Sequence, residues 1–144
     1  MTEVDERARL IETARTWIGT PFHDNQGVKA LGCDCAHFLA RVAEEAGLVE
    51  PVAIEIYSPQ FMLHSDEEKF ESYLTRFARE IPEDAAEMGD VVLYRVGKSF
   101  AHGAFIVSWP DRILHAFKVF GCVAETHGRE QGLARKQVRF YSFW

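Results

Sequence analysis

The sequence has no apolar run long enough for a membrane-spanning helix, and residues 1–5 are acidic, unlike the start of a signal peptide. It also lacks a basic excess, because 16 Lys and Arg against 22 Asp and Glu give a net charge of −6. Nucleic acid is therefore not expected as the main partner, since phosphate binding needs a basic surface. We expect synthesis in the cytoplasm without a cleaved signal and without a membrane span.

Cysteines are few and do not suggest a disulfide framework. There are three, an odd number, and Cys33 and Cys35 lie one residue apart, leaving Cys122. Repeats, linkers and low-complexity tracts are also missing. What is present is an ordinary globular composition, with 47% hydrophobic residues in 144. This predicts a single domain over residues 1–144, with free thiols suited to a reducing compartment.

The first half of the chain has helical periodicity. Thr2 is expected to cap a helix that ends near Gly19 and Pro21, and residues 20–34 are expected to form a loop. A second helix is predicted over residues 35–46. The expected core stripe of the first helix is Val4, Ala8, Ile11, Ala14 and Ile18. Further helix starts are predicted at Ser58-Pro59 and at the capping box of residues 65–68, the latter with Phe70, Tyr73, Leu74 and Phe77 on one face.

After Pro82 the pattern becomes strand-like. The predicted strands are residues 90–96, 101–108, 112–117, 122–126 and 138–143. Helices followed by short antiparallel strands indicate an α+β fold.

The most informative residue is Cys35, which directly precedes the apolar-periodic stretch of the second helix. A thiol in the first helical turn lies near unpaired N–H groups and the positive end of the helix dipole, which favour the thiolate. Cys35 is therefore a candidate nucleophile, and it needs a histidine base oriented by a third polar group.

Six histidines are available as the base. His102 and His115 stand on two strands that the turn signal Trp109-Pro110-Asp111 would join as antiparallel neighbours. If Pro110-Asp111 is a two-residue turn, His115 pairs with Ile106, shares the face of His102 and lies roughly 13 Å from it, at about 3.3 Å per residue. A bulge would shorten this gap. Taken singly, a strand histidine is more often a packed residue than a catalyst. His64 and His127 are expected at the surface, whereas His23 and His37 flank the presumed cleft.

Five blocks of sequence, in order, resemble the NlpC/P60 cysteine peptidases, and most closely their short branch associated with phage tails and gene-transfer particles. The blocks are residues 14–23, 32–35, 88–94, 101–104 and 113–116. The resemblance implies a papain-like α+β fold with the cysteine helix facing an antiparallel sheet. It also implies hydrolysis of bacterial peptidoglycan stem peptides between D-γ-glutamyl and a diamino acid, without a metal or cofactor.

By motif position, the resemblance makes Cys35 the nucleophile, His102 the general base and His115 the residue that orients it. Asp34 then helps to hold the site and the free amine of the substrate. Phe22 stands where the family usually has Tyr, and Ala36-His37 replace the usual small pair. Phe22, His23, Asp34 and His37 are the candidate substrate-binding residues. The phage branch implies phage-tail or gene-transfer-particle partners, with delivery by a tail and action in the periplasm.

Alternatives stay open from the sequence. Papain-like relatives can act as amidases or acyltransferases on the same constellation. An inactive relative would bind the cell wall as a structural tail module. A metal site built from Cys33, Cys35, Cys122 and a histidine is disfavoured, because Cys-x-Cys is not the usual zinc spacing.

Overall fold

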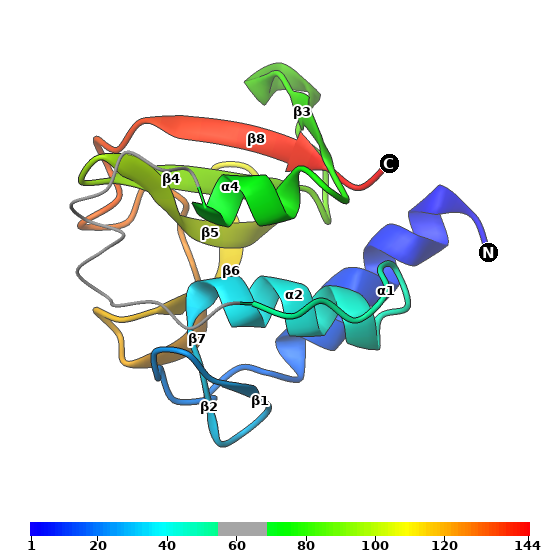
Figure 1. The fold of residues 1–144 in the computed structure, drawn as a ribbon. Helices are drawn as coiled ribbons and strands as arrows, with labels where there is room; N and C mark the ends of the chain where they lie inside the picture. Colours follow the sequence, from blue (N-terminus) through cyan, green and yellow to red (C-terminus); the bar gives the residue numbers. More distant parts are fainter. Residues whose placement is uncertain (55–68) are drawn as a thin grey trace.

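The computed structural model describes residues 1–54 and 69–144, and its core is a six-stranded antiparallel sheet with helices against one face (Figure 1). The strand order is β3-β8-β4-β5-β6-β7, and β1 and β2 form a separate small hairpin. The helices are α1 (Glu3–Arg15), α2 (Cys35–Glu45) and α4 (Lys69–Leu74), with a 3₁₀ turn η1 (Glu83–Ala85). The strands are β1 (Gly27–Val28), β2 (Gly32–Cys33), β3 (Arg79–Ile81), β4 (Val91–Val96), β5 (Ser99–Ser108), β6 (Arg112–Phe117), β7 (Cys122–Thr126) and β8 (Val138–Ser142). The α+β prediction is confirmed.

Helix α1 begins as predicted and ends early. Thr2 forms a capping box with Asp5, but the helix stops at Arg15 rather than near Gly19. The predicted core stripe is partly wrong, because Val4 is 73% and Ile18 48% exposed. The buried face instead holds Arg7, Leu10, Ile11 and Ala14.

Arg7 is buried because the end of the sheet supplies partners for its guanidinium. Nη1 donates to the carbonyl of Met88 at 2.7 Å and to Asp90 at 2.8 Å, and the group lies 4.3 Å from the ring centre of Trp144. The other carboxylate oxygen of Asp90 accepts from the N–H of Glu87 at 2.8 Å. A buried charge is tolerated only when it is paired in this way. The contacts tie α1 to the start of β4 and to the C-terminus.

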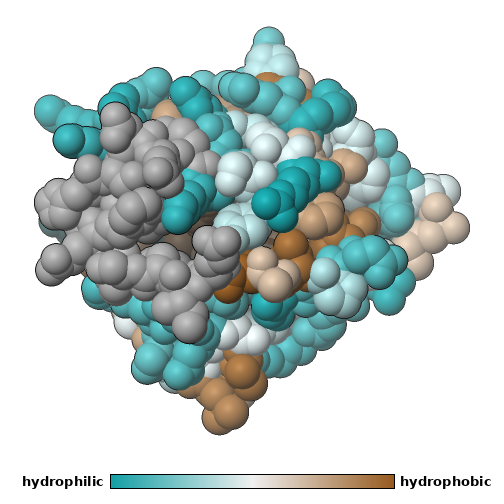
Figure 2. Space-filling view, viewed as in Figure 1, coloured by the Kyte–Doolittle hydropathy of each residue, from teal (hydrophilic) through white to brown (hydrophobic). Residues whose placement is uncertain are grey.

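The segment of residues 20–34 is more ordered than the predicted loop, because it contains the hairpin of β1 and β2. Val28 and Leu31, which belong to this hairpin, are 52% and 73% exposed. Figure 2 shows a brown protrusion at its lower edge, where Figure 1 places the hairpin. The helix starts predicted at Ser58-Pro59 and residues 65–68 lie outside the described residues, as does His64.

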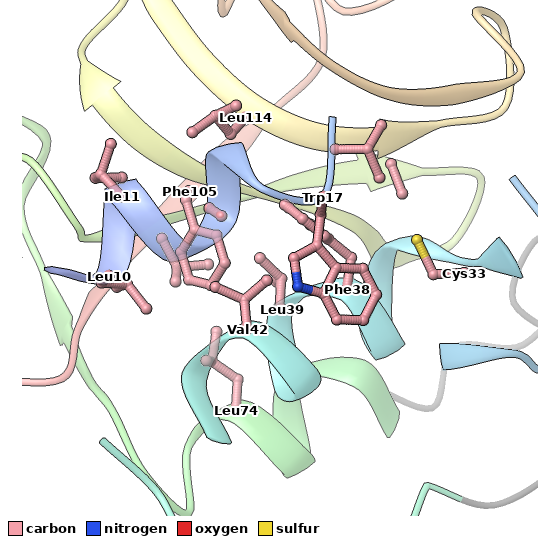
Figure 3. Close-up of a cluster of buried hydrophobic side chains, with 14 of the residues drawn as sticks. Leu10, Ile11, Trp17, Cys33, Phe38, Leu39, Val42, Leu74, Phe105 and Leu114 are labelled. Carbon is pink, nitrogen blue, oxygen red and sulfur yellow. The ribbon is translucent and has the colours of Figure 1, made fainter. Parts of the chain in front are cut away.

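Helix α2 begins at Cys35, as the sequence predicts, because Asp34 caps it by accepting from the N–H of His37 at 2.8 Å. Its buried side chains, Phe38, Leu39 and Val42, contact β5 and β6. Figure 3 shows these residues pointing into one cluster with Leu10 and Ile11 of α1 and Trp17. The cluster orients α2 with its first turn at the sheet.

The five predicted strands are present within one or two residues, and β3 is an additional strand that pairs with β8. Two register shifts interrupt the ladders of β5. One lies opposite Tyr94 and Arg95 of β4, and the other lies between Ile106 and Ser108, beside β6. The turn predicted at Trp109-Pro110-Asp111 is confirmed, with three residues rather than the two considered for the register, and Trp109-Pro110 is a cis peptide bond.

Gly103 of β5 lies where the helices approach the sheet most closely. A Cβ placed there would be 2.7 Å from Leu39 of α2, 2.9 Å from Phe70 of α4 and 3.0 Å from Leu93 of β4. These distances are shorter than carbon atoms tolerate. A side chain at residue 103 would therefore force these three side chains to move.

We expect Gly103→Ala to lower the free energy of unfolding by about 1–3 kcal/mol, because overpacking a filled core forces side chains off their rotamers. Urea unfolding followed by circular dichroism measures the change. Ser108→Ala, at an exposed position of the same strand, is the control and should stay within about 0.5 kcal/mol of the parent. An unchanged midpoint for Gly103→Ala would contradict the packing described.

Candidate active site

The candidate nucleophile lies beside an edge of β5 that pairs with no strand in the described part of the chain. The N–H and C=O of Ile106 bond toward the start of β4, to Asp90 and Gly89, each at 2.8 Å. These groups alternate between the two edges of an antiparallel strand, so the N–H of Gly103 faces the β6 side. Within the described residues, the ladder to β6 begins only at Phe105. The edge around residues 101–103 is therefore open.

The thiol of Cys35 occupies this opening. Its Sγ donates to the carbonyl of Ala101 at 3.5 Å, and the N–H groups of Gly103, Ala36 and Cys35 itself favour the thiolate. Burial of the sulfur and the negative charge of Asp34 act in the opposite direction, and they raise the pKa of Cys35 to about 12. The helix start stabilises the thiolate as predicted, but the expectation of a net preference for thiolate is wrong in the resting protein.

His102 and His115 are brought together in the structure. Nε2 of His102 lies 2.8 Å from Nδ1 of His115, and the ring centres are 5.1 Å apart. The separation of roughly 13 Å that a regular turn predicts is wrong. Phe105 pairs with Leu114, which brings His115 two residues closer to His102 than a two-residue turn would. One residue of this difference comes from the three-residue turn 109–111, and the other comes from the register shift after Ile106. The bulge considered from the sequence is therefore present.

Both histidines are enclosed by aromatic rings. Phe117 stacks on His115 at 4.8 Å between ring centres and lies 5.2 Å from His102, and Tyr94 lies 5.7 Å from His102. Burial lowers the pKa of His102, and burial together with the neighbouring His102 lowers that of His115. At neutral pH both rings are therefore neutral, as is the thiol of Cys35.

A third polar residue, Thr126, completes the row and was not identified from the sequence. Its Oγ1 lies 2.9 Å from Nε2 of His115 and donates to the carbonyl of His127 at 3.3 Å. The ladder pairs His115 with Ala124, so Thr126 is the diagonal neighbour of His115 on the same face of β7. The signal in the sequence was the hydroxyl residue Thr126, which lies two residues after Ala124, the strand partner of His115.

Asp34 and His37 form a compact unit behind the nucleophile. One carboxylate oxygen of Asp34 accepts from the N–H of His37 and lies 2.7 Å from its Nδ1, and the other accepts from the N–H of Asn25 at 2.8 Å. Asp34 is fully buried, and His37 is 7% exposed and packs against Gly27 of the hairpin. The predicted substrate contacts of both residues stay predictions, but their observed contacts connect α2 to the hairpin.

Phe22 and His23 lie on the segment between α1 and the hairpin. Phe22 is partly buried, and its N–H donates to the carbonyl of Gly121 at 2.8 Å. His23 is exposed, with Nδ1 3.0 Å from the carbonyl of Asp24. Their contact with substrate also stays a prediction. Cys33 is fully buried in the core, and burial raises its pKa to about 12, which suits a thiol without a chemical role.

Two broader features concern residues 1–54 and 69–144 alone. No helix there is long and apolar enough to cross a membrane. In that same part of the chain, no three His, Cys, Asp or Glu side chains gather in the way that a metal ion would require.

The fold is that of NlpC/P60 domains, and solved structures of that class align along almost the whole chain. An NLP/P60 lipoprotein from Staphylococcus aureus aligns with 96% of this chain at a TM-score of 0.68 and 13% identity, and this chain spans 42% of its length. The NlpC/P60 domain of the peptidoglycan hydrolase SagA aligns over 92% of this chain and 96% of its own length, with a TM-score of 0.64 and 20% identity.

The peptidoglycan hydrolase RipB of Mycobacterium tuberculosis aligns over 99% of this chain and 68% of its own length, with a TM-score of 0.65 and 18% identity. The neighbours also include RipD of the same organism, described as a non-catalytic domain adapted to peptidoglycan binding, with a TM-score of 0.62, 13% identity and coverage of 95% and 96%. No family sequence model and no curated sequence matches the chain. The likeness is one of fold.

We expect the protein to lose stability as the pH falls below about 6.5. The pKa values of His102 and His115 are lower in the folded protein than in the unfolded chain. At a pH between the two values, the unfolded chain binds more protons than the folded protein, so acid favours unfolding. Each imidazole contributes up to about 1.4 kcal/mol per pH unit in this window. Urea unfolding at pH 7.5, 6.5 and 5.5 measures the slope. His115→Gln should flatten it, whereas the exposed His127→Gln should not; equal slopes for all three proteins would contradict the burial described.

We expect Asp34→Asn to make Cys35 more reactive. The substitution removes the negative charge that raises the pKa of the thiol, while Asn still caps the helix. Alkylation of Cys35 by iodoacetamide at pH 7.5 should be several-fold faster, as measured by mass spectrometry of the labelled peptide. Label on the fully buried Cys33 in the same sample reports general unfolding and should stay absent. A slower reaction of Cys35 would show that the capping geometry outweighs the charge.

Proposed function

We propose that this protein is a cysteine peptidase of the NlpC/P60 type that hydrolyses bacterial peptidoglycan, within the stem peptide, between D-γ-glutamyl and a diamino acid. The observation that carries the proposal is the thiol of Cys35 at the open edge of β5, directly beside the backbone of His102, which is paired with His115. The names of the structural neighbours SagA and RipB, both peptidoglycan hydrolases, support the substrate class.

The chemistry begins from the neutral pair. His102 takes the proton of Cys35 while the sulfur attacks the carbonyl carbon of the scissile amide, so the thiolate forms only as it is used. The N–H of Cys35, in the first turn of α2, is a donor for the oxygen that becomes negative. His102 then gives the proton to the departing amine, which leaves a thioester on Cys35. Water, deprotonated by His102, hydrolyses the thioester and restores the thiol.

A second candidate function is binding without catalysis, which the neighbour RipD favours because it shares the fold and is non-catalytic. The geometry here favours catalysis instead, because the candidate nucleophile lies against the backbone next to His102, and His102 is hydrogen-bonded to the candidate orienting residue His115. Amidase or acyltransferase chemistry needs the same three groups, so only the products distinguish it. Partnership with a phage tail or gene-transfer particle, and action in the periplasm, stay predictions from the sequence resemblance.

We expect Cys35→Ala and His102→Ala each to reduce hydrolysis of defined muropeptides by at least about 10³-fold, because each removes a group that takes part in bond formation. Mass spectrometry of the digest identifies the bond. Cys122→Ser removes a second thiol, outside the site, and should keep full activity.

Three results would contradict the proposal. Full activity of Cys35→Ala would remove the nucleophile from the mechanism. Release of the intact stem peptide from the glycan would indicate an amidase. Binding of wild-type protein to sacculi with no cleavage product would indicate the binding function.

A further inference from the structure

His102, His115 and Thr126 form a row of hydrogen bonds that ends at the carbonyl of His127. The groups at that end determine which atom donates in each hydrogen bond of the row. The carbonyl of His127 can only accept, so the hydroxyl proton of Thr126 points to it at 3.3 Å. Oγ1 of Thr126 is then the acceptor for Nε2–H of His115, at 2.9 Å. Thr126 therefore determines which nitrogen of His115 carries the proton.

The same reasoning continues inward to the base. A neutral imidazole has a single N–H, so His115, protonated on Nε2, has a bare Nδ1 that accepts. The hydrogen bond of 2.8 Å to His102 must then be donated by Nε2–H of His102. This leaves Nδ1 of His102 without a proton and able to receive one.

We propose that the hydroxyl of Thr126 is a positioning group that sets the tautomer of His115 and, through it, keeps Nδ1 of His102 unprotonated and ready to act as the base. The inference rests on the proposed hydrolase function only for its effect on rate. The recorded partners of the hydroxyl are His115 and the carbonyl of His127, so it acts on the base through His115.

The enclosure of His115 explains why a single hydroxyl suffices. The ring is fully buried, with Phe117 stacked on one face and Phe120 at 6.5 Å between ring centres. Thr126 is the hydrogen-bond partner that the structure records at Nε2. The arrangement also suits both states of the base, because the imidazolium formed on His102 still donates from Nε2 to His115, and no proton in the row has to move.

The test compares Thr126→Val, which has the same shape without the hydroxyl, with Thr126→Ser, which keeps the hydroxyl. Nitrogen-15 NMR of histidine-labelled protein at pH 7.5, without substrate, reads the tautomers directly. In the wild type we expect Nε2 protonated and Nδ1 bare on both His102 and His115. Thr126→Val should populate the Nδ1–H tautomer of His115, and Thr126→Ser should restore the wild-type spectrum.

The kinetic arm uses a defined muropeptide. Thr126→Val should lower kcat by about tenfold with little change in KM, less than the loss of about 10⁴-fold in a triad held in the wrong tautomer, and Thr126→Ser should recover most of the rate. A wild-type spectrum with Nδ1 of His102 protonated overturns the inference, and so does an unchanged spectrum for Thr126→Val. If Thr126→Val does not fold, the wild-type spectrum decides alone. A protein with the expected tautomers that cleaves no muropeptide overturns the proposed function instead.

Discussion

The close approach of helix α2 to the open edge of β5 is the constraint on which the rest of the site depends. It requires a residue without a side chain at Gly103, where Leu39 and Phe70 fill the space that a Cβ would take. It also requires that β6 be unpaired with β5 at this level, so that the sulfur of Cys35 can take the place of a neighbouring strand. The nucleophile is thus held by the sheet as well as by its own helix.

The second requirement is met by irregularities in the sheet. The register shift after Ile106 brings His115 closer to His102, and the shift opposite Arg95 interrupts the ladder just before His102. In a regular ladder the two histidines would lie on one face but too far apart to bond. The bulges therefore bring His102 and His115, which share a face of the sheet, close enough to form a hydrogen bond. Bulges near active sites commonly redirect side chains in this way.

How much of this is readable in the sequence depends on the range of the interactions involved. The start of α2 at Cys35 was predictable, because the cap at Asp34 and the apolar spacing are local. The burial of Arg7 was not, because its partners Met88 and Asp90 are more than eighty residues away. The resemblance identified residues 88–94 as a marker of the family, and the structure shows Asp90 there bonding Arg7 and the backbone of Glu87, a structural task.

The pairing of His102 with His115 was only partly predictable from the sequence. Alternation along the strands predicted the shared face, and the local sequence indicated a turn at Trp109-Pro110-Asp111. The register, however, depends on the exact length of that turn and on a bulge, which no local pattern reveals. The protonation states were beyond the sequence for the same reason. A helix start favours a thiolate wherever it occurs, whereas the opposing effects, burial and the charge of Asp34, exist only in the packed structure.

The neutral resting state follows from that packing and has a chemical consequence. A thiolate and an imidazolium held apart from solvent would need stabilisation by the protein before any substrate arrives, and the aromatic enclosure of His102 and His115 opposes such charges. In the proposed mechanism, transfer of the proton during attack instead develops charge where the N–H groups of α2 and Gly103 can meet it. Because thiols react with oxidants chiefly as thiolates, the raised pKa of Cys35 also makes this thiol less reactive toward oxidants. The packing that disfavours the thiolate in the resting protein therefore also protects the candidate nucleophile from oxidation.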